Sequence, residues 1–163
     1  MNVEKNIQTD RLRLSPILWT DLLFFFRLLG NDHVRKFLGG PVPLPIRLSR
    51  FKAYRRGHPK VGIWMVRNKA TKKVLGMIEL TPNQDDKDYE VSYQFHPTSW
   101  GSGFAREAIT GVINHGLERI IAETQTANTR SCRLLEGLGF ATIDTVARYG
   151  AQQRLYAIDQ LVA

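Results

Sequence analysis

Polar and apolar residues alternate in several short stretches, and each of these stretches predicts a strand. TDRLRLSPI predicts a first strand at about residues 12–16. Two β-rich runs flank the turn-like NKATKK and predict an antiparallel hairpin, while YEVSYQF alternates from Tyr89 to Phe95. ERIIAETQ predicts a further strand, and ATIDTVARYG and RLYAIDQLV predict a final strand pair.

The first half of the chain contains two predicted helices with a loop between them. TDLLFFFRLLGND predicts a helix that Thr20 or Asp21 can cap and that Gly30 can end. SRFKAYRRG predicts a second, basic helix with Ser49 as its candidate cap. The prolines and glycines of LGGPVPLPI predict a loop between these helices, because they interrupt the hydrogen bonding of both helices and strands.

Two further predicted helices alternate with strands in the second half. FAREAITGVINHGL predicts one helix, and TRSCRLLEGLGF predicts the other, with Asn128 as its N-cap and Gly139 at its C-terminal end. The predicted order of elements is β-α-α-β-β-β-α-β-α-β-β. This order predicts an α/β fold, in which helices cover the faces of a mixed sheet.

The bulk composition is that of an ordinary globular domain. The chain has 163 residues, of which 43% are hydrophobic and 23% charged, and we expect a single domain over residues 1–163. No apolar run approaches the length of a membrane span, and the N-terminal residues contain no apolar stretch, so we expect neither a membrane segment nor a secretory signal. The single cysteine, Cys132, is typical of a reducing compartment, which predicts a cytoplasmic protein.

A formal net charge of +8 favours an anionic partner. The densest basic run, RLSRFKAYRRGHPK, is either the solvated face of a helix or a docking surface for an acidic partner. A basic nucleic-acid-binding domain is another interpretation of this charge. The sequence contains no recognition-helix motif and no clustered aromatics, however, so we expect no nucleic-acid partner.

The stretch WGSGFAREA places two glycines between a predicted strand and a predicted helix. The free N–H groups and the dipole of a helix N-terminus favour an anion, and Gly101 and Gly103 have no Cβ that would block it. Alternatively, the glycines only form a bulge and a cap. The stretch is not a P-loop, because GxxxxGK[ST] is absent, and Arg106 takes the place of the third glycine of a dinucleotide fingerprint.

Two motifs in register, WGSGFAREA and NTRSCRLLEGLGF after EVSYQFHP, resemble the GNAT superfamily of N-acetyltransferases. TDRLRLSPI and VLGMIELTP resemble in particular the branch that includes the ribosomal-protein N-terminal acetyltransferases. The resemblance covers roughly residues 8–158. It implies a GNAT-like acyl-CoA N-acyltransferase fold with a mostly antiparallel sheet, and acetyl-CoA as co-substrate. It also implies a primary amine as acceptor (a protein N-terminus or a small molecule), no metal, no membrane, and a monomer or homodimer.

The resemblance also implies which residues contact acetyl-CoA. The family binds the pyrophosphate through backbone N–H groups of a Q/R-x-x-G-x-G/A loop, whose leading residue here is Thr98. In the family, the pantetheine arm of acetyl-CoA lies along the preceding strand. An asparagine at the start of the last helix holds this arm, and a serine lies near the sulfur of the cofactor. The residues at these positions are Tyr93, Phe95, His96, Trp100, Gly101, Ser102, Gly103, Phe104, Ala105, Asn128 and Ser131.

Acetyl transfer to an amine requires a base for the amine's proton and a donor for the departing sulfur. Glu79 and Glu90 are the candidate bases, with Ser131 as a third catalytic candidate; each carboxylate could instead be a solvent-exposed acid. His96 and His115 are further options for the base.

Three other side chains have packing as their simpler explanation. Tyr149 and Tyr156 could donate to the sulfur, and Cys132 is an inert thiol, because no supporting His and acid accompany it.

Substrate recognition is expected from the first two helices and LGGPVPLPI. The basic residues Arg50, Lys52, Arg55 and Arg56 would suit an acidic peptide or a phosphorylated small molecule. An alternative function is a module of the same fold that binds CoA without turnover.

Overall fold

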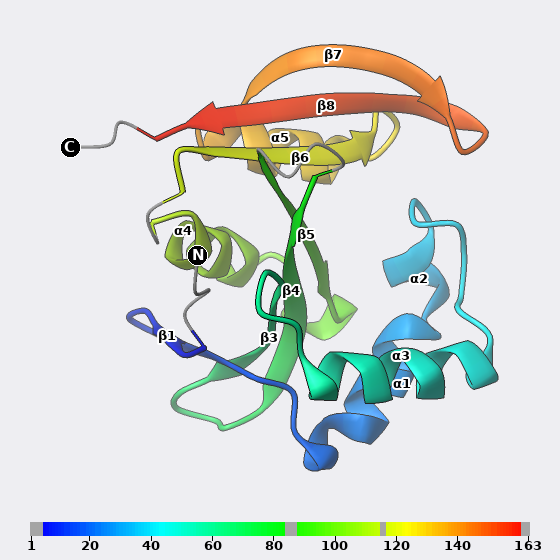
Figure 1. The fold of residues 1–163 in the computed structure, drawn as a ribbon, viewed down its shortest axis with the longest axis vertical. Helices are drawn as coiled ribbons and strands as arrows, with labels where there is room; N and C mark the ends of the chain where they lie inside the picture. The colour runs from blue at the N-terminus through cyan, green and yellow to red at the C-terminus, as the bar shows by residue number, and fades with distance from the viewer. Residues whose placement is uncertain (1–4, 84–87, 115–116, 161–163) are drawn as a thin grey trace.

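The computed structural model describes residues 5–83, 88–114 and 117–160, and a mixed sheet runs through this part of the chain (Figure 1). Its eight strands follow the order β1-β2-β3-β4-β5-β6-β8-β7. Neighbouring strands are antiparallel except β5 and β6. The strands are β1 (Ile7–Gln8), β2 (Leu12–Ser15), β3 (Gly62–Asn68), β4 (Val74–Pro82), β5 (Tyr89–Phe95), β6 (Arg119–Gln125), β7 (Ala141–Arg148) and β8 (Ala151–Asp159). The predicted mixed sheet is confirmed.

Helices cover both faces of the sheet (Figure 1). The α1–α3 side packs on β3 and β4 through a core that includes Phe25, Phe51, Met65 and Met77. Helices α4 and α5 pack on the opposite face, against a second core centred on β3 to β6 and β8. The helices are η1 (Trp19–Asp21), α1 (Leu22–Leu29), α2 (Asp32–Arg35), α3 (Leu44–Arg56), η2 (Pro97–Ser99), α4 (Phe104–Ile113) and α5 (Thr129–Gly137).

The segment between α1 and α3 differs from its prediction. Helix α3 begins at Leu44, so residues 44–46 are helical and the expectation of a loop through them is wrong. Pro45 lies in the first turn of α3, where no backbone N–H is needed for the helix, and therefore does not interrupt it. Ser49 lies inside α3 and does not cap it. The short helix α2 was not predicted, although Asn31 Oδ1 caps it by accepting from the N–H of Val34 at 3.0 Å.

Asp21 has a different role from the predicted cap. It occupies the N-cap position of α1 but makes no side-chain cap hydrogen bond there. Its carboxylate instead accepts from the N–H of Leu18 at 2.7 Å and from both terminal nitrogens of Arg67 at 2.8 Å. This buried ion pair ties the turn before α1 to β3.

The parallel pair β5 and β6 separates soon after it begins. The two strands pair only through Tyr89 with Ile120 and Glu90 with Ile121. Beyond these pairs β5 continues beside β4 and β6 continues beside β8, so the sheet opens between them. The glycine loop and α4 follow β5, and α5 follows β6, which brings both predicted motifs to this opening.

Most of the remaining elements follow their predictions, whereas β1, η1 and η2 were not predicted. The hairpin of β3 and β4, the strand at β5, and the final strand pair of β7 and β8 are confirmed. Helix α4 is described as far as Ile113 and Asn114, and His115 lies outside the described residues. In the described part of the chain, none of the helices has the length and apolar character that crossing a membrane would require.

Candidate active site

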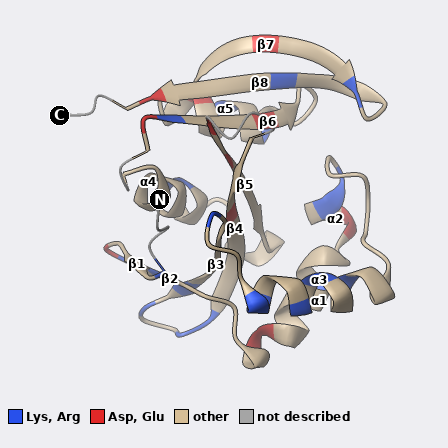
Figure 2. Ribbon diagram, in the orientation of Figure 1, with Lys and Arg blue, Asp and Glu red and all other residues tan. Residues whose placement is uncertain are grey.

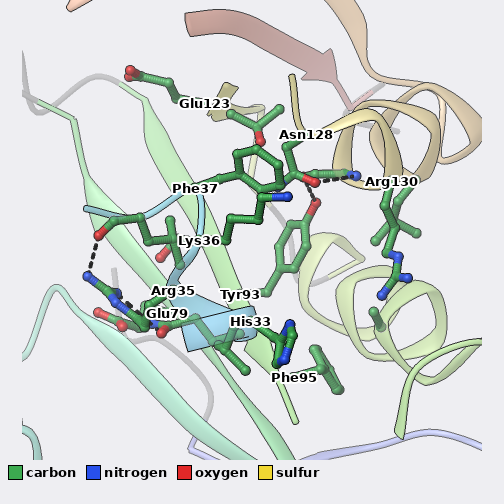
Figure 3. Close-up of a pocket in the computed structure, with 18 of the residues that line it drawn as sticks. His33, Arg35, Lys36, Phe37, Glu79, Tyr93, Phe95, Glu123, Asn128 and Arg130 are labelled. Carbon is green, nitrogen blue, oxygen red and sulfur yellow. Dashed lines mark hydrogen bonds between the residues drawn. The ribbon is translucent and has the colours of Figure 1, made fainter. Parts of the chain in front are cut away.

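A cavity of about 790 Å³ lies where β5 and β6 separate (Figure 3). Its lining comes from segments far apart in the sequence, namely α2 and the residues after it, α3, β4, β5, β6 and the start of α5. Figure 3 shows two sides to it: Tyr93 and Asn128 lie toward α5, and Arg35 and Glu79 lie toward β4 and α2. We refer to these two sides as the α5 wall and the acceptor wall, the latter after the role proposed for it.

The glycine loop at the end of β5 has the backbone of an anion cradle. Gly101 and Gly103 have φ angles of 78° and 77°, which residues with a Cβ rarely adopt. A Cβ built on Gly101 would meet no atom within 4 Å, so the space beside this backbone is open. Among the described residues, no acceptor takes the N–H groups of residues 101–105. Gly103 is also the N-cap of α4, so the simpler cap interpretation holds together with the cradle.

The first hairpin of the chain supports this loop from behind. Arg11 donates from Nη1 to the carbonyl of Ser102 at 3.0 Å and from Nε to Glu107 at 2.6 Å. Its guanidinium lies 4.6 Å from the centroid of Phe104, and Thr9 donates to Glu107 at 2.5 Å. Although burial raises the pKa of Glu107, the hydrogen bonds from Thr9 and Arg11 lower it overall. These contacts were not predicted, because Arg11 is more than 90 residues away in the sequence from Ser102 and Glu107.

Residues just before the glycines hold the strand end and η2 together. His96 Nδ1 lies 2.9 Å from Thr98 Oγ1, so the side chain of Thr98 forms a hydrogen bond within the turn that contains it. The indole N–H of Trp100 donates to the carbonyl of Phe95 at 2.8 Å, and the guanidinium of Arg130 lies 4.1 Å from the Trp100 ring. Tyr93, Phe95, Trp100 and Ala105 line the cavity. The other predicted cofactor contacts of this stretch are not among its lining residues, namely His96, Gly101, Ser102, Gly103 and Phe104.

Helix α5 brings a serine and an asparagine to the β5 wall. Asn128 Oδ1 accepts from the N–H of Ser131 at 3.3 Å, which confirms the predicted N-cap. Ser131 Oγ lies 2.6 Å from the hydroxyl of Tyr93. Burial raises the pKa of Tyr93 to about 12, so its hydroxyl remains protonated at neutral pH and can donate. All three residues line the cavity, as the sequence motifs predicted for a shared site.

Glu79 lies on the opposite wall. It is half-buried on β4, and its Oε2 accepts from the hydroxyl of Tyr54 on α3 at 2.6 Å. Burial raises the pKa of Glu79 above its ordinary value, against the opposing effects of the Tyr54 hydrogen bond and the charges of Arg50 and Arg35. A half-buried carboxylate with a raised pKa in a cavity is the arrangement that a general base requires.

Glu90, the other predicted base, is not among the residues that line the cavity. It lies at the pairing point of β5 and β6. Burial and the neighbouring charge of Glu123 raise the pKa of Glu90, and Arg148 opposes them. Glu123 does line the cavity, but Arg148 already binds it, with Nε 2.8 Å from Oε1. The structure therefore separates the two candidate bases: Glu79 lines the cavity, whereas Glu90 lies where β5 pairs with β6, outside the lining.

The remaining candidates lie away from the cavity lining. Tyr156 is fully buried and donates to Glu136 at 2.9 Å, and Tyr149 is 85% exposed in the turn between β7 and β8. Cys132 is buried inside α5, as expected of a packing residue. Across the described ranges, no group of three or more His, Cys, Asp or Glu side chains is placed to hold a metal ion.

Sequence reasoning missed three residues of the acceptor wall, namely Arg35, Tyr54 and Gln94. Arg35 comes from the unpredicted helix α2, and its Nη1 donates to Gln94 Oε1 at 3.3 Å. Tyr54 meets Glu79 only because α3 crosses β4 in three dimensions. The available signals were an Asn-Asp pair after Gly30, typical of a helix start, and a lone tyrosine within a basic helix.

Comparison with known proteins identifies the family to which the chain belongs. Residues 11–141 match the family model of the acetyltransferase (GNAT) domain. An uncharacterized N-acetyltransferase of Bacillus subtilis, YoaA, is 30% identical over 153 residues, which cover 88% of this chain and 86% of that protein.

Solved structures share the fold. A GNAT-family acetyltransferase from Bacillus anthracis superposes with a TM-score of 0.81 at 21% identity, over 94% of this chain and 98% of that one. Spermidine N-acetyltransferase from Vibrio cholerae, in complex with CoA and spermine, superposes with a TM-score of 0.80 at 20% identity, over 93% and 97% of the two chains.

Proposed function

The chain belongs to the GNAT family and is an acetyl-CoA-dependent acetyltransferase, and from this premise we propose that Glu79 accepts the proton of a primary amine acceptor. The observation that carries the proposal is the position of Glu79, which lines the same cavity as Tyr93, Asn128 and Ser131. The acceptor is an amine of a protein N-terminus or of a small molecule. The resemblance to the branch that includes the ribosomal-protein N-terminal acetyltransferases favours a protein N-terminus as one such acceptor.

The loop and the β5 edge fit acetyl-CoA. We assign the pyrophosphate to the N–H groups of residues 101–105, where the backbone is free and the space beside Gly101 is open. We assign the pantetheine arm to the edge of β5 that β6 leaves unpaired, with Asn128 beside it. When bound, acetyl-CoA supplies an acetyl thioester, and the positive net charge of the chain suits its phosphates.

We assign one proton transfer to each wall of the cavity: removal of the amine's proton to the acceptor wall, and donation to the departing sulfur to the α5 wall. An amine with an ordinary pKa of about 8 to 10 is largely protonated at neutral pH, so it must lose a proton before it can attack. Glu79 takes this proton, with Tyr54 fixing the orientation of the carboxylate. On the other wall, the hydroxyls of Ser131 and Tyr93 are placed to donate toward the departing sulfur. Tyr93 is suited to donation because its pKa of about 12 keeps it protonated.

The test is release of free thiol from acetyl-CoA in the presence of a panel of amines. The panel contains peptides with free N-termini, amino acids, and the polyamine spermidine, since one structural neighbour binds spermine. We expect thiol release that depends on both acetyl-CoA and an amine, with the acetylated amine confirmed by mass spectrometry. Binding of acetyl-CoA without acetylation of any amine would contradict the proposal and leave the alternative of a CoA-binding module without turnover.

A further inference from the structure

The acceptor wall of the cavity carries more positive than negative charge. Arg35, Lys36 and Arg50 line it, against Glu79 and Glu123. Figure 2 shows basic positions on α2 and α3, the helices that supply these side chains. Because Arg148 already binds Glu123, Glu79 is the one carboxylate on this wall left to face the three cations. An acceptor with several ammonium groups is therefore poorly matched to this wall, whereas an amine with a negative group is well matched.

The two arginines of this wall differ in what they bind. Each side-chain nitrogen of Arg35 already donates: Nε to the carbonyl of Gly40 at 3.0 Å, Nη1 to Gln94 at 3.3 Å, and Nη2 to the carbonyl of Leu38 at 2.5 Å. Arg50 has neither a hydrogen-bond acceptor nor an ion-pair partner among the described residues, although it is half-buried and lines the cavity. Its guanidinium thus keeps spare donors that face the acceptor space.

Arg50 is also set apart from the other basic residues of α3. Arg55 lies with its guanidinium 4.4 Å from the Trp19 ring, outside the cavity lining, and Lys52 and Arg56 are exposed. Of the four basic residues proposed from the sequence to bind an acidic partner, Arg50 alone reaches the cavity. Arg50 and Glu79 line the same cavity, so an anion-binding group and the proposed base face one space.

We propose that Arg50 binds a carboxylate of the acceptor, so that the substrate is an amine with a carboxylate a few bonds from its nitrogen. This inference rests on the proposed function and deepens it. The planar guanidinium matches the two oxygens of a carboxylate in a bidentate pair. Glu79 then contacts the amine and Arg50 binds the carboxylate, so the acceptor wall recognises both groups of such a molecule. A free amino acid and a peptide that begins with an acidic residue share this chemistry.

Two matched pairs of acceptors test the proposal. The first pair is alanine and alaninamide, and the second is two peptides that differ only in beginning with aspartate or asparagine. We expect kcat/KM to favour the carboxylate member of at least one pair by about 10- to 100-fold, as a charge-assisted hydrogen bond provides. The pair that shows this preference identifies the source of the carboxylate. Spermidine is expected to be a poor acceptor.

Three variants separate direct binding from indirect effects. R50Q should abolish the preference, R50K should retain part of it, and R56Q, an exposed arginine on the same helix, should leave it unchanged. R50Q also removes a charge that acts on Glu79, but this change affects both members of a pair equally and cancels in their ratio. The different amine pKa values of alanine and alaninamide contribute equally to this ratio in the parent and in each variant, so they cancel when the parent's ratio is compared with a variant's ratio. Thermal melts verify that each variant is folded.

The outcomes distinguish this inference from the proposed function. If the amides or spermidine are acetylated as well as the carboxylates, or if R50Q keeps the preference, the inference fails and the acetyltransferase with Glu79 as base stands. If no amine of any kind is acetylated while acetyl-CoA binds, the proposed function fails, and the inference fails with it.

Discussion

Replacing Glu79 with glutamine should abolish most of the activity while preserving the site. Glutamine keeps the volume of the side chain and an oxygen for the Tyr54 hydroxyl, which lies 2.6 Å from Oε2 of Glu79. It removes the negative charge and, with it, the ability to take a proton. A positioned general base contributes about 10²- to 10⁴-fold, or about 3–5 kcal/mol. Because Tyr54, Arg50 and Arg35 oppose the rise of the pKa of Glu79 and limit its basicity, we expect a loss of about 100-fold.

Although E79Q should lose activity, its stability should be equal to or higher than that of the parent protein. Burial raises the pKa of Glu79 above its unfolded value of about 4.3, so the folded state binds this proton more tightly. The contribution of Glu79 to stability therefore falls as pH rises from the unfolded pKa through the higher folded pKa. At pH 7, which is above the unfolded pKa, the raised pKa of Glu79 therefore costs stability, and E79Q should melt at an equal or higher temperature than the parent protein. At pH 4 the difference should shrink.

The assay combines thiol release, calorimetric titration with acetyl-CoA, and thermal melts at both pH values. E90Q is the matched control, because Glu90 is also half-buried and also has a raised pKa but does not line the cavity. Affinity for acetyl-CoA should stay within about twofold in both variants, since the residues assigned to it lie on the other wall. Retention of activity by E79Q within about threefold, or a greater loss in E90Q, would refute the assignment of the base.

Three further predictions concern the scaffold of the site. Gly101→Ala should destabilise by about 1–2 kcal/mol through its φ of 78° and weaken CoA binding measured by calorimetry; unchanged affinity would count against the cradle. Asn128→Ala should lower stability by about 0.5–2 kcal/mol in thermal melts through loss of the α5 cap. Arg67→Met should cost about 3–5 kcal/mol in urea unfolding by leaving Asp21 buried and unpaired; a loss below about 1 kcal/mol would contradict the buried pair.

The two walls of the cavity differed in how far the sequence could predict them. The α5 wall depends on local signals: glycines at positive φ before α4, and an asparagine three residues before the serine whose N–H it caps. These patterns act within a few residues, so they appear in the sequence. On the acceptor wall, Glu79 was one of two equivalent candidates, and Arg35 and Tyr54 were not considered. Their roles arise where α2 and α3 cross β4 and β5, which no local pattern encodes.

Patterns within short stretches were enough to predict the mixed sheet, the places of most helices and strands, and the glycine loop, because alternation, caps and glycine conformations are properties of neighbouring residues. It failed locally at α3, where Pro45 stands in a first turn that tolerates it and was taken for a helix breaker. The choice between Glu79 and Glu90 depended on how the elements are arranged in space, since strand alternation places both residues on one face of the sheet. The separation of β5 from β6, together with residues of α2, α3 and α5, forms the cavity that Glu79 lines, whereas Glu90 stays at the pairing of β5 with β6, outside the lining.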